Sequence, residues 1–259
     1  MWDRPDILNR LASALCAVSF LLAAFAAAHY AMRLPAFALR EVRVTNVLAH
    51  VTPDQVETVV ARELKGNFFT LDLELARAGF EKLPWVRKTA VRRQWPDRLE
   101  VAIEEHVALG RWGDAGLVNT YGERFSAAYG TAATVGESGA ALPLFVGPPG
   151  SEKEIAIQYG YFKRSLGTLG LVPVQVQVSA RRAWQVRVAS GITLQLGRED
   201  IESRLERFIA VYARTVGRLD RKLTYIDLRY SNGFAVGIPE LGQPQQGEPR
   251  QHKPARVAG

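Results

Sequence analysis

The chain has 259 residues, of which 47% are hydrophobic and 23% charged, and its formal net charge is +7. This composition excludes a wholly disordered protein, and the length suffices for one large or two smaller domains beside a membrane segment. Basic residues are spread along the chain among acids, so the charge fits acidic partners or lipid headgroups better than nucleic acid.

An apolar run without a charge, Pro or Gly covers Leu11 to Ala28. As a helix it spans about 27 Å, close to the hydrocarbon core of a bilayer, so we expect a transmembrane helix over residues 11–32 after a short segment, 1–10. A cleaved signal peptide is the alternative, although its apolar stretch is usually shorter. Arginines on both sides leave the orientation open. The only cysteine, Cys16, lies inside the run, which is compatible with an oxidising compartment.

The following 70 residues predict a small α+β domain with the order strand, helix, helix, strand, strand. Thr52 and Gln55 predict a capping box at the start of the first helix, and Asp72 is the expected cap of the second. The expected strands cover residues 39–45, 86–93 and 99–105, with turn residues 95–97 between the last two.

After Trp112, short strands separated by Gly and Pro predict a mostly antiparallel sheet with two helices. Ser151 and Glu154 predict a capping box for the first helix, and an apolar stripe from Ile201 to Val216 predicts the second. Strands are expected over 116–119, 142–146, 174–179, 184–188, 192–196, 225–230 and 234–238, the last two joined tightly by Asn232-Gly233. The polar tail, 240–259, is expected to be disordered.

The sequence offers no converging set of catalytic groups, so no enzyme, cofactor or metal site is expected. The four histidines have no metal-like spacing, and common nucleotide and hydrolase motifs are absent. We interpret the one local acid and His cluster, Glu104-Glu105-His106, as a solvated strand end. The basic residues of the predicted hairpin could contact nucleic acid, but a solvated face near anionic headgroups is the favoured interpretation: Arg87, Lys88, Arg92, Arg93 and Arg98.

The last predicted strand, Phe234 to Ile238, is followed at once by Pro239 and the polar tail. Such a strand is expected at the sheet edge, where unpaired backbone groups invite another chain to add a strand. The alternative is a short strand that merely completes the sheet.

Several motifs in one order carry a resemblance to a known family. They are Pro84-Trp85-Val86, the run 91–99, Ile103 to His106, Leu117-Val118-Asn119, Leu142-Pro143-Leu144, Arg181 to Trp184, and Tyr225 to Tyr230. From Phe37 to about Pro239 the chain resembles the FtsQ/DivIB family of bacterial cell-division proteins. It departs at Val107, where relatives often have Pro, and in its short N-terminal segment.

The resemblance implies a POTRA domain over 37–107 and a β domain over 108–239. It further implies a single-pass inner-membrane protein with a cytoplasmic N-terminus and a periplasmic bulk at the division septum. Such a scaffold binds FtsB and FtsL, meets other divisome proteins through the POTRA domain, and controls septal peptidoglycan synthesis. The implied partner-binding residues are Arg181, Arg229, Tyr230, Asn232, Gly233, Phe234, Val236 and Ile238. The alternative is a POTRA-type transport or chaperone module, for which repeated units or a barrel would be expected.

Overall fold

A computed structural model of the chain describes residues 5–32, 37–113, 116–126, 141–219, 223–230 and 232–238. The start of the predicted N-terminal segment, 1–4, and the predicted disordered tail, 240–259, lie outside the described residues. The chain divides into two compact units, Met1–His106 and Val107–Gly259. Each unit has a hydrophobic core of its own.

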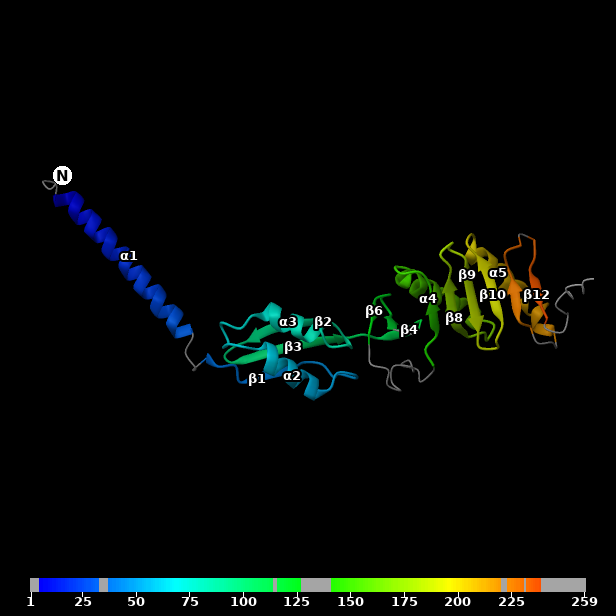
Figure 1. Ribbon diagram of the computed structural model, residues 1–259, viewed down its shortest axis with the longest axis horizontal. Coiled ribbons are helices and arrows are strands. Elements are labelled where there is room, and N and C mark those ends of the chain that lie inside the picture. Colours follow the sequence, from blue (N-terminus) through cyan, green and yellow to red (C-terminus); the bar gives the residue numbers. More distant parts are fainter. Residues whose placement is uncertain are drawn as a thin grey trace, which may run out of the picture. The chain divides into compact units, whose positions relative to one another are not determined.

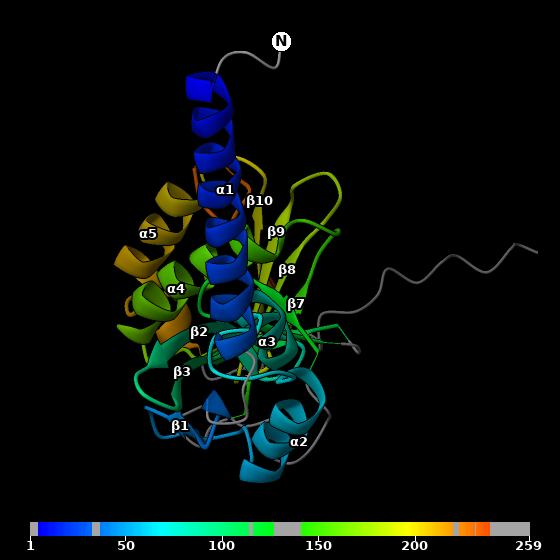
Figure 2. The same cartoon turned by 90° about the vertical axis from the view of Figure 1, so that its left-hand side faces the viewer.

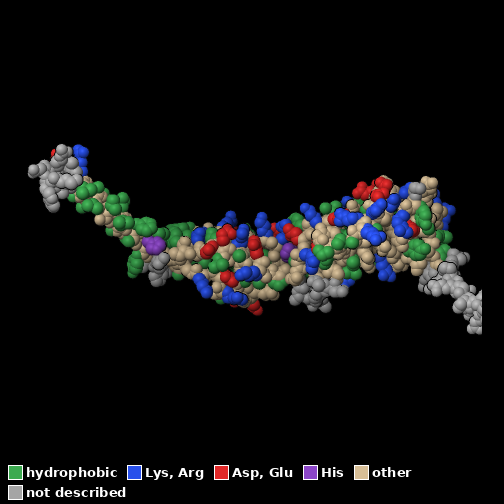
Figure 3. Space-filling model, turned by 45° about the horizontal axis from the view of Figure 1, so that its top comes forward, with side chains coloured by type: hydrophobic (Ala, Val, Ile, Leu, Met, Phe, Trp, Pro, Cys, Tyr) green, Lys and Arg blue, Asp and Glu red, His purple; other side chains and the backbone are tan. Residues whose placement is uncertain are grey.

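Helix α1 (Pro5–Met32) precedes the first folded unit (Figure 1). Its stretch Asn9–Met32 is long and apolar enough to cross a membrane, and none of it is buried in the protein. Figure 3 shows apolar side chains along this helix, whereas charged side chains are scattered over the visible face of the two units. The length and composition of this helix fit a single-pass membrane protein.

The rest of the first unit is a three-stranded sheet with two helices. Its elements are β1 (Glu41–Val44), α2 (Pro53–Glu63), α3 (Leu73–Glu81), β2 (Val86–Gln94) and β3 (Arg98–Glu105). The sheet order is β1-β3-β2, with β1 parallel and β2 antiparallel to β3. The predicted alternation along the last strand is confirmed, because Leu99, Val101 and Ile103 are buried beneath the helices.

The predicted helix starts in this unit are confirmed by their hydrogen bonds. The Gln55 side chain accepts the Thr52 backbone N–H at 3.1 Å, and the Asp72 carboxylate accepts the N–H groups of Glu74 and Leu75 at 2.9 and 3.1 Å. Each cap satisfies donors that have no partner within the helix.

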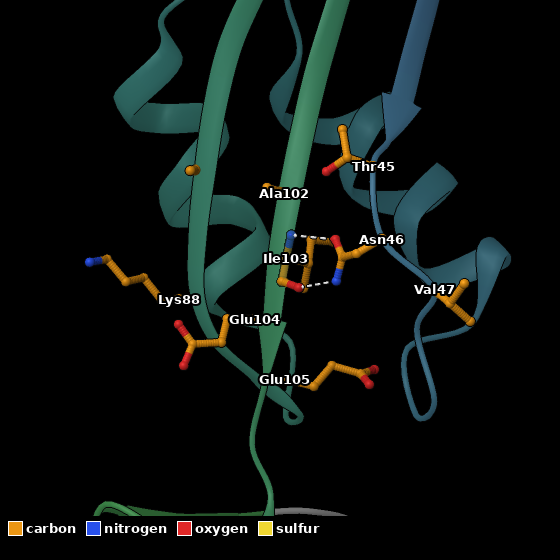
Figure 4. Close-up of a pocket in the computed structure, with 9 residues that line it drawn as sticks. Thr45, Asn46, Val47, Lys88, Ala102, Ile103, Glu104 and Glu105 are labelled. Atoms are coloured by element: carbon orange, nitrogen blue, oxygen red, sulfur yellow. Dashed lines mark hydrogen bonds between the residues drawn. The ribbon is translucent and has the colours of Figure 1, made fainter.

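Glu105 is not the solvated strand end that the sequence suggested. Its carboxylate accepts the backbone N–H groups of Ala49, His50 and Val51 at 2.8, 2.9 and 2.7 Å, and its side chain is only 13% exposed. Its neighbour Glu104 points the other way and pairs with Arg87 at 2.8 Å. Glu105 therefore fastens the loop before α2 to the end of β3. Two residues earlier on β3, the Asn46 side-chain amide donates to the Ile103 carbonyl and accepts the Ile103 N–H, as the dashed lines in Figure 4 show.

This arrangement predicts a pH dependence for the first unit. Burial alone would raise the pKa of Glu105, but the three N–H donors and nearby His50 outweigh burial and hold its pKa below the ordinary value. The stabilisation is therefore complete above the unfolded pKa of about 4.3 and is lost as the pH falls through the lower folded pKa. We expect Glu105→Gln to destabilise the unit at pH 7 by about 1–3 kcal/mol. Unfolding curves at pH 7 and pH 3 check this, because the difference in free energy of unfolding between variant and parent should be smaller at pH 3.

The second unit contains a nine-stranded sheet. Its strands are β4 (Ala108–Trp112), β5 (Gly116–Asn119), β6 (Arg124–Phe125), β7 (Leu144–Val146), β8 (Pro173–Val178), β9 (Trp184–Val188), β10 (Thr193–Gly197), β11 (Tyr225–Asp227) and β12 (Ala235–Gly237). The order is β12-β11-β10-β9-β8-β7-β4-β5-β6. Most neighbours are antiparallel, as predicted, but β10-β11, β8-β7 and β7-β4 are parallel.

Helices α4 (Glu152–Gly167) and α5 (Ile201–Tyr212), with the short 3₁₀ helix η3 (Val216–Arg218), complete the unit. Figure 2 shows α4 and α5 on the same side of the sheet. Buried residues of the strands alternate accordingly, so that Val176, Val186 and Leu194 lie in the core with Phe162 and Phe208 of the helices. The opposite face carries polar side chains such as Gln185 and Arg187.

Two details of the second unit differ from the sequence prediction. Strands β4 and β6 were not predicted, since β4 has a Gly and Arg within it and β6 is only two residues long. The prediction of a capping box at the start of α4 is wrong. The Ser151 hydroxyl donates to the Pro148 carbonyl at 2.6 Å, and Glu154 pairs with Arg182 at 2.6 Å. The side chains expected to serve the helix end serve the neighbouring turns.

Candidate partner-binding edge of the second sheet

Strand β12 lies at one edge of the nine-stranded sheet. It pairs antiparallel with β11, with Tyr225 opposite Gly237 and Asp227 opposite Ala235, and among the described residues no strand covers its other side. The Thr224 backbone N–H and hydroxyl both donate to the Gly237 carbonyl at 2.9 Å, which therefore faces β11. Because successive residues of a strand direct their backbone groups to opposite sides, the N–H and C=O of Val236 face the open edge.

The connection between β11 and β12 is longer than predicted. The strands end at Asp227 and resume at Ala235, so residues 228–234 separate them, in place of a tight Asn232-Gly233 turn. The cause is local: the Asp227 carboxylate accepts the Arg229 N–H at 3.0 Å and bends the chain out of the strand. The predicted strand 225–230 is therefore cut to three residues.

Arg229 forms a fork-like ion pair with Asp227. Its Nε and Nη2 donate to the two carboxylate oxygens at 2.8 and 2.6 Å, while Asp227 is nearly buried. Hydrogen bonding from Arg229 outweighs burial and lowers the pKa of Asp227. The pair rests over Gly197, whose φ is +80° and where a Cβ would lie 3.2 Å from the Arg229 side chain. Arg229 thus shapes the connection before it meets any partner.

The residue just before β12, Phe234, packs on helix α5. Phe234 meets the ring of Phe208 edge-on, with centroids 5.8 Å apart, and Val236 lies opposite fully buried Ile226. Beside them a hollow of about 310 Å³ opens between α5 and the connection. It is lined by Arg204, Arg207, Phe208, Val211, Thr215, Leu228, Asn232, Gly233 and Phe234. An apolar floor with arginines at its rim suits an apolar side chain that is flanked by an acidic group.

The outer part of the site is exposed. Tyr230 is 58% exposed and lines a second, shallow hollow with Asn232, Gly233, Phe234 and Ala235. The ring of Tyr225 on β11 lies over Gly237 on β12, where there is no room for a Cβ. Ile238 is half-buried and is the last described residue.

Arg181 lies apart from the edge but at the same end of the sheet. It is exposed in the turn between β8 and β9, and among the described residues it has no ion pair. The start of β9 lies opposite the end of β10, which runs parallel to β11, so this turn and the connection 228–234 face the same way. Three strand spacings, about 14 Å, separate β9 from β12. A partner must extend beyond a single strand to reach both.

The arginines of the basic hairpin in the first unit form ion pairs and hydrogen bonds with carboxylates and backbone carbonyls of the same unit. Arg92 bonds Glu100 through two nitrogens at 2.8 Å, and Arg98 lies 3.0 Å from Glu41. Arg93 donates to backbone carbonyls of the loop before α3. These pairings favour the solvated-face interpretation. Within the described ranges, no group of three His, Cys, Asp or Glu side chains has metal-binding proximity.

Sequence patterns missed the contribution of α5 to the site. The apolar stripe predicted that Phe208 is buried, but its contact with the ring of Phe234 is seen only in the folded structure. Arg204 could have been predicted at the site, because it lies one helical turn before Phe208. In the structure its Nη1 donates to the Leu196 carbonyl at 2.7 Å.

The fold and the site define a protein with one helix that fits a membrane span and two folded units, the second with an open sheet edge beside a hollow rimmed by arginines. Residues 37–106 match the family model for the POTRA domain of FtsQ type, and residues 110–229 match that for the C-terminal part of cell division protein FtsQ/DivIB. The second match ends inside the connection 228–234, before β12.

Curated relatives give the same result over most of the chain. Cell division protein FtsQ of Nitrosospira multiformis is 43% identical over 91% of this chain and 98% of its own length. Those of Burkholderia pseudomallei and Escherichia coli are 41% and 33% identical, over 91% and 80% of this chain and 94% and 74% of their own lengths. The chain belongs to the FtsQ/DivIB family of cell-division proteins. A role in the division machinery follows from this membership.

Proposed function

We propose that the protein is a non-enzymatic scaffold of the divisome that binds FtsB and FtsL through the β12 edge. One observation carries the proposal: β12 is an edge strand whose Val236 backbone faces outward beside the hollow under Phe234. An added strand would bond to that backbone, and an apolar side chain of the partner would enter the hollow. Exposed Tyr230 supplies an aromatic contact at the rim.

Arg181 is the proposed second contact. Its position at the same end of the sheet suits an acidic side chain on the segment of the partner that flanks the added strand. Arg229 has a different role in this proposal, because it holds the connection through Asp227. Removing Arg229 would disturb the site indirectly, whereas removing Arg181 would remove a direct charge contact.

The proposed topology places the N-terminus in the cytoplasm and both units in the periplasm, at the division septum. Helix α1 would hold the scaffold beside partners that are anchored in the same membrane, and this confinement raises their effective concentration. The first unit would serve other division proteins, so that early and late components are linked and septal peptidoglycan synthesis is controlled.

A POTRA-type transport or chaperone module is the alternative function. It is less well supported, because the part of the chain that the structure describes contains one unit of this type. Depletion distinguishes the two functions: loss of a division scaffold gives filamentous cells with unfinished septa, whereas loss of an envelope transport module gives defective outer-membrane proteins with normal division.

The binding site is tested with the full chain in detergent and the periplasmic segment of FtsB from the same organism. We expect Tyr230→Ala to weaken binding about tenfold or more, since exposed aromatic residues at interfaces often contribute 2 kcal/mol or more. Phe234→Lys should weaken it as well, but it also disturbs the contact with Phe208. Tyr121→Ala, at an exposed tyrosine of β5's loop, is the matched control and should bind normally. Unchanged affinity in both Tyr230→Ala and Phe234→Lys would exclude the edge as the site.

A further inference from the structure

Three segments of the first unit meet at the end of its sheet where the chain enters from α1. Strand β1 begins opposite the start of β3, with Glu41 beside Arg98, and β2 ends there with Gln94. The Arg40 N–H donates to the Asp97 carbonyl at 3.0 Å. The turn between β2 and β3 therefore lies beside the first residues after the anchor.

The loop between α2 and α3 joins the same end. The Phe68 N–H donates to the Phe37 carbonyl at 2.9 Å, and the ring of Phe69 meets that of Phe37 edge-on at 5.0 Å. Arg93, near the end of β2, donates from Nε to the Phe68 carbonyl at 2.6 Å and from Nη2 to the Leu71 carbonyl at 2.5 Å. The loop is thereby held in place by the strand.

The covalent chain keeps this end close to the membrane. Helix α1 ends at Met32, and five residues of extended chain reach at most about 18 Å, so Phe37 lies within that distance of the helix end. The Asn67 side-chain amide also donates to the Met32 carbonyl. Since α1 is the membrane segment, these residues are confined to the bilayer surface or its immediate neighbourhood.

The side chains at this end are those that favour a lipid headgroup layer. Trp95 is 76% exposed, and Phe69 is still 41% exposed although the rings of Phe37 and Phe68 meet it edge-on. Trp is enriched at membrane interfaces because its ring is apolar while its N–H finds a polar partner there, and an exposed Phe beside it adds apolar surface that lipid can cover. Positions 40–43 and 92–100 together hold five arginines and three acids, a net charge of +2. This balance attracts anionic lipids.

We propose that this end of the first unit, formed by Phe37, Phe69, Trp95 and the surrounding arginines, docks on the anionic bilayer that α1 crosses. Phe69 and Trp95 enter the headgroup layer as interfacial anchors. The first unit then stands with the far end of its sheet directed away from the lipid. The inference rests on α1 and on the first unit, and it is independent of the partner edge on β12.

Spin labels at single cysteines test the proposal in the full chain. The chain carries Cys16→Ala and one new cysteine at position 69, 95 or 47, in nanodiscs of phosphatidylethanolamine and phosphatidylglycerol. Val47 is the matched control, since it is 98% exposed and Figure 4 shows it near Glu105, which lies at the opposite end of β3. We expect labels at 69 and 95 to lose collisions with a water-soluble nickel chelate and to gain collisions with oxygen, relative to the label at 47.

Two outcomes would overturn the proposal. Equal nickel accessibility at all three positions would place this end in water. A loss of nickel collisions without a gain of oxygen collisions would mean that protein, rather than lipid, covers the labels. If the label at position 69 disturbs the contact with Phe37, the label at position 95 alone tests the proposal. The side chain of Trp95 is largely exposed, so its replacement removes few packing contacts.

Discussion

We expect binding of the FtsB segment to fall about tenfold or more when Val236 is replaced by proline. The outward N–H of Val236 is the donor that an added strand requires, and proline removes it and places its ring against the incoming backbone. Proline is tolerated on edge strands where the N–H faces outward, so the bonds from β11 at Ala235 and Gly237 are kept. One or two lost hydrogen bonds, at about 0.5–1.5 kcal/mol each, together with the steric clash account for the expected loss.

The matched control is Val236→Ala, which shortens the same side chain and keeps the N–H. Isothermal titration with the full chain in detergent separates the two effects. If binding depends on the backbone of β12, the alanine variant retains most of the affinity that the proline variant loses. Equal affinities for Val236→Pro and the parent chain would show that the partner does not extend this sheet.

Replacing Phe208 by alanine is expected to destabilise the second unit by about 3–5 kcal/mol. Phe208 is 1% exposed and contacts the rings of Tyr212 and Phe234, so its removal leaves a cavity beneath the edge strand. Amide hydrogen exchange in β9 and β10 measures the free energy of opening for this unit without interference from the first one.

Ile157→Ala is the control for that measurement, because Ile157 lies on α4 with 64% of its surface exposed. Its effect should stay within about 0.5 kcal/mol. A Phe208→Ala variant with unchanged exchange would mean that α5 does not support the sheet in solution. If exchange in β9 and β10 changes but binding of FtsB does not, the hollow beneath Phe234 has no part in recognition.

Local patterns were sufficient to predict the first unit. The alternation of Leu99, Val101 and Ile103 and the caps at Thr52 and Asp72 depend on neighbours within a few residues, so the sequence contains the information directly. Glu105 was misinterpreted because its three donors lie more than 50 residues away in the chain. No local pattern reports such a contact.

The second unit shows the same division between local and distant causes. The strands around Val176, Val186 and Leu194 were predicted as short runs separated by Gly and Pro, whereas the length of the last hairpin connection was not predicted. The dipeptide Asn232-Gly233 favours a tight turn, but the pair of Asp227 and Arg229 bends the chain earlier, and pairing with β10 fixes where β11 begins. The family resemblance predicted the residues of the proposed site. The hollow beneath Phe234, which α5 helps to form, could not be predicted because it depends on how distant segments pack.

Both edges of the nine-stranded sheet are short, with three residues in β12 and two in β6, as far as the described residues extend. Edge-to-edge pairing between copies gains a few backbone bonds at most, so crowding of many copies at one place in the cell does not by itself drive them to polymerise through their sheets. A short edge is therefore selective. A chain that binds stably must add side-chain contacts to the few backbone hydrogen bonds, and an extended peptide without such contacts dissociates.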